Sequence, residues 1–260
     1  MKKIFGILFL ALTINGFAQE TATTTPPAEK VKAPKAEKVA TPKTNKPKVD
    51  YSKMDLSKRA SDHFMLQFGL AGWGGKPANI TTKTFNRTFN GYFLFDFPFK
   101  TNPHLSVAVG PGIGTDNIYF DQMTVDLNGR NGVTFTRDTI VKYKKHKLVT
   151  GYVEAPVELR YSSNPQNMNK GWKAAFGVKV GTMIDAKMKS KVDLDATGTG
   201  GYFTKEKDKR YFNTTRFALI GRFGYGNISV FGTYTVTDFF KEGQGPIVRP
   251  FSVGLTLSGL

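Results

Sequence analysis

The feature that most constrains this chain is the regular alternation of bulky apolar residues with small or charged ones. In YVEAPVELRY, residues 152–161, Val153 and Val157 alternate with Glu154 and Glu158. Successive side chains of a strand point to opposite faces, so this segment has one apolar face and one charged face. We therefore expect a sheet that separates an apolar environment from a polar one.

The same two-residue period recurs along most of the chain after residue 61. No window of comparable length has the spacing of an amphipathic helix, so an all-β fold is expected. The pattern predicts eight strands, at residues 62–74, 88–99, 104–114, 148–161, 171–185, 211–224, 227–240 and 248–259.

The connections between these predicted strands alternate in length. The long ones are residues 75–87, 115–147, 186–210 and 241–247, and the short ones are 100–103, 162–171 and 225–227. Short periplasmic turns and long outer loops are typical of outer-membrane barrels. The predicted fold is an eight-stranded antiparallel up-and-down transmembrane β-barrel with periplasmic N- and C-termini. The connection at 115–147 is long enough for a hairpin of its own.

The less bulky face of several strands is built from small residues. Rows of Gly, Ala and Ser occur at alternate positions in 106–112 and 252–258. Such residues suit the crowded interior of an eight-stranded barrel, which is only wide enough for side chains. The bulky face is then expected to meet lipid. A soluble periplasmic β-barrel binding protein, with its bulky face inward, is the alternative.

This orientation directs charges of both signs into the lumen. Because desolvated charges need partners, we expect an interior salt-bridge network. The alternative is that trapped water solvates each charge individually. The predicted network comprises Asp96, Glu154, Glu158, Arg160, Lys173, Lys179, Asp185, Arg216 and Arg222.

A membrane barrel should also carry aromatic residues at both rims. The predicted girdle comprises Phe99, Tyr161, Trp172 and Tyr225 near the periplasmic rim, and Trp73, Tyr211 and Phe239 near the outer rim.

The N-terminal part differs in composition from the barrel. Residues 1–18 have the charged start, short apolar run and small final residue of a signal peptide. Residues 19–60 are rich in Lys and Pro, and we expect a disordered periplasmic arm there, with residues 61–260 forming the barrel domain. The arm is either a solvated spacer or a tether to peptidoglycan, lipid or periplasmic proteins. Export argues against nucleic acid as the partner of this +17 chain.

Residues suited to catalysis are sparse. The chain has no cysteine, and its three histidines are expected at strand ends, far from a catalytic or metal-binding arrangement. We predict no enzymatic activity, cofactor or metal, and no open pore. The basic segments KMKSK (187–191) and KEKDKR (205–210) suggest contact with lipopolysaccharide in the outer membrane, although solvated loop charge is an equal alternative.

The segments FNGYFLFDFPFKTNPHLSVAVGPGIGTDNIYF, GYVEAPVELRY, GWKAAFGVKVGTMID and RPFSVGLTLSGL resemble the PorT-like outer-membrane β-barrel proteins of Bacteroidota. The resemblance covers residues 62–260 and implies an eight-stranded barrel without catalytic residues. The expected function is a structural or surface-binding role in the outer membrane. The resemblance adds the alternative of an accessory component of a protein secretion system.

Overall fold

The computed structural model describes residues 63–130, 132–138, 143–192, 201 and 203–259. The predicted signal peptide (1–18) and the Lys/Pro-rich arm (19–60) lie outside these residues. Within the described ranges, no helix is both long and apolar enough to span a membrane.

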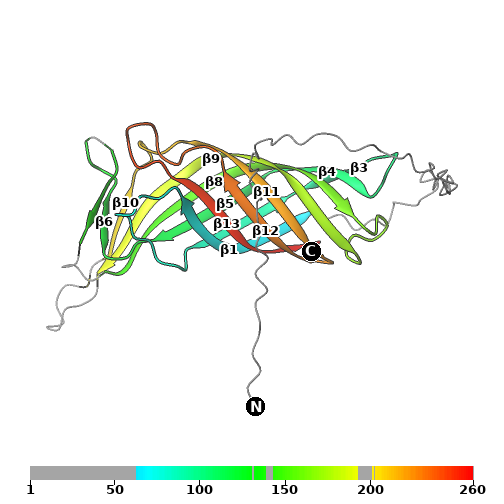
Figure 1. The fold of residues 1–260 in the computed structure, drawn as a ribbon, viewed down its shortest axis with the longest axis horizontal. Helices are drawn as coiled ribbons and strands as arrows, with labels where there is room; N and C mark the ends of the chain where they lie inside the picture. Colours follow the sequence, from blue (N-terminus) through cyan, green and yellow to red (C-terminus); the bar gives the residue numbers. More distant parts are fainter. Residues whose placement is uncertain (1–62, 131, 139–142, 193–200, 202, 260) are drawn as a thin grey trace, which may run out of the picture. The chain divides into compact units, whose positions relative to one another are not determined.

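Eight antiparallel strands form a closed barrel, which confirms the predicted fold (Figure 1). We call each of these eight barrel strands a stave, because two of them consist of two shorter strands. Each stave pairs with its neighbour in sequence, and the last pairs with the first, so the sheet has no free edge around the barrel. The staves are β1 (Phe64–Gly74), β2 (Arg87–Phe93) with β3 (Phe95–Pro98), β4 (Leu105–Val109) with β5 (Gly112–Tyr119), β8 (Tyr143–Ser162), β9 (Trp172–Val192), β11 (Thr215–Tyr225), β12 (Ile228–Thr235) and β13 (Arg249–Ser258).

Two of the staves are interrupted without losing register. Tyr92 lies opposite Gly112, and Phe95 lies opposite Val109, so pairing continues in step across both breaks. One break falls at Pro111, which has no N–H to donate to the ladder. Each interrupted pair of strands therefore acts as one stave.

The connections differ at the two ends of the barrel. Residues 99–104, 163–171 and 226–227 form what we call the short-turn end, where β1 begins and β13 ends. The long-loop end holds the other connections, 75–86, 120–142, 193–214 and 236–248 (Figure 1).

Three short strands extend the long-loop end. β6 (Met123–Asp126) and β7 (Thr134–Arg137) pair as a hairpin in the connection where one was expected. β10 (Phe203–Lys207) pairs with the last part of β9 and was not predicted. β8 and β9 also continue beyond their predicted ends, so strands rather than irregular loops make up part of this end.

The barrel is apolar outside and polar inside. Phe176 and Val230 on the outer wall are 64% and 60% exposed, whereas Glu158 and Thr256 on the inner wall are at most 1% exposed. The soluble alternative is wrong, because it requires the bulky face to point inward.

Candidate functional site

The middle of the lumen holds an ion cluster around Glu154. Its Oε2 accepts a hydrogen bond from Lys179 Nζ at 2.9 Å and another from the Tyr92 hydroxyl at 2.7 Å. Its Oε1 pairs with Arg216, whose Nη1 lies 2.8 Å from Asp116 Oδ2. The Glu154 cluster links β2, β5, β8, β9 and β11 across the interior.

A second cluster surrounds Glu158 nearer the short-turn end. Glu158 Oε2 accepts from Arg222 Nη2 at 2.6 Å and from Arg160 Nε at 3.0 Å. Arg160 Nη1 lies 3.7 Å from Asp96 Oδ1, which also accepts from the Ser106 hydroxyl at 2.7 Å. The Glu158 cluster therefore joins β3, β4, β8 and β11.

These two clusters bring together most of the charges predicted for the lumen. The residues that contact one another there are Asp96, Glu154, Glu158, Arg160, Lys179, Arg216 and Arg222. Lys173 also points inward, and its Nζ donates to Asn169 Oδ1 at 3.3 Å. Direct ion pairs, rather than charges solvated one by one, therefore organise this interior.

Sequence reasoning missed one charged member of the network. Asp116 lies two residues beyond the predicted end of its strand at residue 114, but β5 continues to Tyr119. The alternation of Gly112 and Gly114, extended by one step, was the signal that could have placed Asp116 inside.

The prediction for Asp185 is wrong. Tyr152 lies opposite Met183, but the preceding Gly151 lies opposite Asp185, so β9 carries one extra residue at Ile184. This β-bulge shifts the alternation by one position and turns Asp185 to the outer face. Asp185 Oδ1 there lies 3.0 Å from Lys207 Nζ, and its other carboxylate oxygen pairs with Lys187.

The predicted outer girdle is also wrong for Trp73, Tyr211 and Phe239, which are at most 8% exposed. Trp73 has the same parity along β1 as the inward Gln67, so strict alternation already directs it away from lipid. Tyr211 and Phe239 lie in connections at the long-loop end, and the Tyr211 hydroxyl donates to the carbonyl of Gly129.

Trp73 and Phe239 instead belong to an aromatic cap inside the long-loop end. The ring centroids of Trp73 and Phe239 are 5.3 Å apart, and Phe239 lies 4.9 Å from Phe240 and 5.1 Å from Phe212. We define the aromatic cap as Trp73, Phe120, Phe135, Phe212, Phe239 and Phe240. It covers one end of the lumen with apolar side chains.

The opposite end is filled by a turn. Met168, in the connection between β8 and β9, is 1% exposed and lines a small cavity with Arg160 and Lys173. This cavity and two others along the interior each have a volume of about 10 Å³. Each has room for about one water molecule, so these cavities are not segments of a channel.

Comparison with protein families identifies the family of this barrel. The model of the outer membrane protein beta-barrel domain matches residues 57–244, which is 188 of the 260 residues. The chain belongs to this family. The comparisons with curated proteins and with solved structures each gave no significant match.

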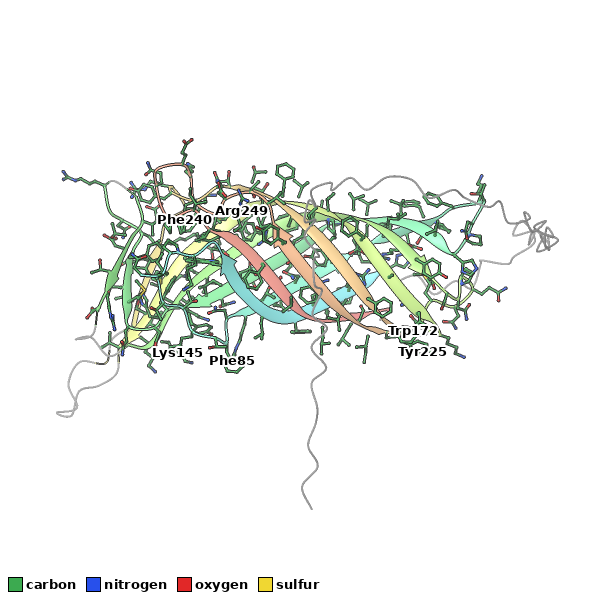
Figure 2. All side chains as sticks on the ribbon, viewed as in Figure 1. Phe85, Lys145, Trp172, Tyr225, Phe240 and Arg249 are labelled. Atoms are coloured by element: carbon green, nitrogen blue, oxygen red, sulfur yellow. The ribbon has the colours of Figure 1, made fainter. Side chains whose placement is uncertain are left out.

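Because the chain belongs to this outer membrane barrel family, its exposed apolar outer wall contacts lipid. The predicted girdle residues Phe99, Tyr161, Trp172 and Tyr225 are 41–57% exposed around the short-turn end. Figure 2 shows Trp172 and Tyr225 together there, and their ring centroids are 5.4 Å apart. Their geometry fits a rim position on this outer membrane barrel.

A buried Ser–His pair lies in the part of this outer membrane barrel beyond the apolar belt. His146 Nδ1 is 2.8 Å from Ser190 Oγ, between the extensions of β8 and β9. Burial lowers the pKa of His146 to about 4, so it is a weak base near neutral pH. Such a pair suits a structural hydrogen bond better than activation of a nucleophile.

The outer surface of the same extensions is strongly basic. β8, β9 and β10 lie side by side, and directly opposed residues share a face of the sheet. We call this surface the basic face. Its lysines are Lys145, Lys147, Lys187, Lys189, Lys191, Lys205 and Lys207.

Proposed function

We propose that this outer membrane barrel is a non-enzymatic protein with a structural or surface-binding role, and that it is not a pore. The observation that carries the proposal is the filled interior. Two ion clusters cross the lumen, the aromatic cap covers one end and Met168 occupies the other. An eight-stranded barrel has little interior space beyond its own side chains, so solute passage would require these contacts to open.

Electrical recording in a planar bilayer tests this proposal. Full-length protein is reconstituted beside a wide porin in the same lipid as a positive control. We expect no conductance steps from this protein, whereas the porin conducts. Stable steps that scale with the amount of folded protein would show that the interior opens and would overturn the proposal.

The proposed orientation places the long-loop end outside the cell and the N- and C-termini in the periplasm. The lengths of the connections support it, because outer-membrane barrels carry their long loops outside. The arm at residues 19–60 then extends into the periplasm. Its basic composition favours peptidoglycan or periplasmic proteins as contacts.

The resemblance to PorT-like barrels favours a second candidate function, as an accessory component of a protein secretion system. It rests on segments such as GYVEAPVELRY and GWKAAFGVKVGTMID. Mild-detergent purification of the tagged full chain tests it. Recovery within a larger periplasmic assembly would support this function, and recovery of the barrel alone would count against it.

A further inference from the structure

We propose that the basic face binds the phosphate groups of a phosphorylated glycolipid of the lipid A type in the outer leaflet. This inference rests on the proposed function for the orientation of the barrel. It identifies the partner class of the surface-binding role, and it depends on neither the interior nor the N-terminal arm.

The arrangement of the lysines is the first argument. Lys147 lies directly opposite Lys189 on one side, and Lys189 lies directly opposite Lys205 on the other. Opposed residues of an antiparallel pair have Cβ atoms about 5 Å apart, and like charges there destabilise the sheet. Anionic charge from outside the sheet would therefore stabilise three lysines in one row.

The described residues supply little of that charge. Asp185 contacts Lys187 and Lys207 at one corner of the basic face. Lys147 Nζ donates to neutral groups, Asn117 Oδ1 at 2.8 Å and the Tyr119 hydroxyl at 3.4 Å. Seven lysines thus share one face with a single carboxylate among the described residues of these three strands.

The height of the basic face on the barrel is the second argument. Ile184, which is 52% exposed, is the last large apolar residue on the lipid-facing wall of β9 before the lysines begin. Lys187 follows three residues later, roughly 10 Å along the strand. The headgroup region begins where the apolar belt ends, so the lysines lie at the level of lipid phosphates.

The register supports a multivalent ligand at this level. Lys145 lies opposite Lys191, in the row next to the Lys147–Lys189–Lys205 row. Phe203, which is 63% exposed, lies opposite Lys191 and adds an apolar contact beside the charges. A lipid with more than one phosphate can neutralise adjacent rows at once, whereas a phospholipid offers one phosphate per headgroup.

The site makes a distinctive prediction about stability. Because the three lysines repel one another when no lipid is bound, Lys189→Gln should raise the urea midpoint of the protein in neutral detergent at low salt. Added lipid A should raise the urea midpoint of this variant by less than it raises that of the unchanged protein. If the basic face binds no lipid A, added lipid A should leave the urea midpoints of both proteins unchanged.

Binding is tested with detergent-solubilised full-length protein and bisphosphorylated lipid A, measured by native mass spectrometry. The test variant is K147Q/K189Q/K205Q. The control variant K83Q/R137Q/K241Q removes the same charge from exposed basic residues elsewhere at the long-loop end. At about 1 kcal/mol per lysine near an anionic lipid surface, we expect binding to weaken about 100-fold in the row variant. The control should change by less than about threefold.

Further ligands identify the source of the phosphate. Phosphatidylglycerol and inorganic phosphate should bind more weakly than lipid A and should discriminate less between the two variants. Equal losses in both variants, no loss in the row variant, or equal binding of phosphatidylglycerol would each overturn the proposal.

Two controls keep this result separate from the proposed function. A heat-modifiability gel checks that each variant is folded. If the triple variant does not fold, Lys189→Gln alone should weaken binding about fivefold. Bilayer recording is unaffected by lipid A binding, so conductance reports on the closed interior whatever happens at the basic face.

Discussion

At the scale of single residues, the interior depends on charges that cannot be removed one at a time. Glu154 is 2% exposed and is held by Lys179, Arg216 and the Tyr92 hydroxyl. Each of these ions lost its hydration when the barrel closed. The penalty is offset only while every charge keeps its partners.

Replacing Glu154 with Ala should therefore be strongly destabilising. The change leaves Lys179 buried without its carboxylate and removes one of the two carboxylates that contact Arg216. We expect a loss of about 3 to 5 kcal/mol in the free energy of unfolding. The measurement is a urea titration in detergent micelles, with Glu206→Ala on the exposed β10 as the matched control. Equal midpoints for the two variants would contradict an interior network.

At the scale of strands, alternation was enough to predict the staves and the direction of most side chains. The prediction failed where the backbone departs from the two-residue alternation of a regular strand. One extra residue at Ile184 reverses the direction of Asp185, and nothing in the local composition marks that bulge. β10 was missed because its charged sequence, FTKEK, is typical of a loop, and its pairing with β9 is a tertiary contact.

The glycines of the staves divide into two classes by the face they occupy. Gly177 faces the lumen, where an added Cβ would collide with the backbone carbonyl oxygen of Val157 on β8. Gly221 faces outward on β11, where an added Cβ would meet no atom within 4 Å. The inner glycine allows close approach of neighbouring staves, whereas the outer one leaves room at the lipid surface.

A matched pair of alanine substitutions tests this difference. Gly177→Ala should lower the free energy of unfolding by about 2 kcal/mol, because a backbone must shift to admit the methyl group. Gly221→Ala should change it by less than about 1 kcal/mol, and a small gain is consistent with reduced chain entropy in the unfolded state. Urea midpoints and the yield of heat-modifiable protein provide the comparison. A larger loss for Gly221→Ala would contradict the assignment of the two faces.

At the scale of the whole barrel, the two ends are closed by different means. The short-turn end is filled by one compact connection, whereas the long-loop end gathers aromatic rings from β1, β7 and three connections. The cap could not be predicted from alternation, because loop residues have no fixed period. Their burial depends on contacts with residues far away in the sequence, such as that between Trp73 and Phe239.

The chain's two tryptophans make this difference directly measurable. Trp73 is 7% exposed within the cap, whereas Trp172 is 54% exposed on the outer wall near the short-turn end. In bilayers with acyl chains brominated close to the headgroup, we expect strong quenching of Trp73→Phe, in which only Trp172 emits. Trp172→Phe, in which only Trp73 emits, should lose little emission. Phospholipids without bromine provide the control for both variants. Equal quenching of the two variants would show that Trp73 faces lipid, as the predicted girdle required. Quenching of Trp73 alone would show that Trp73 faces lipid and Trp172 does not.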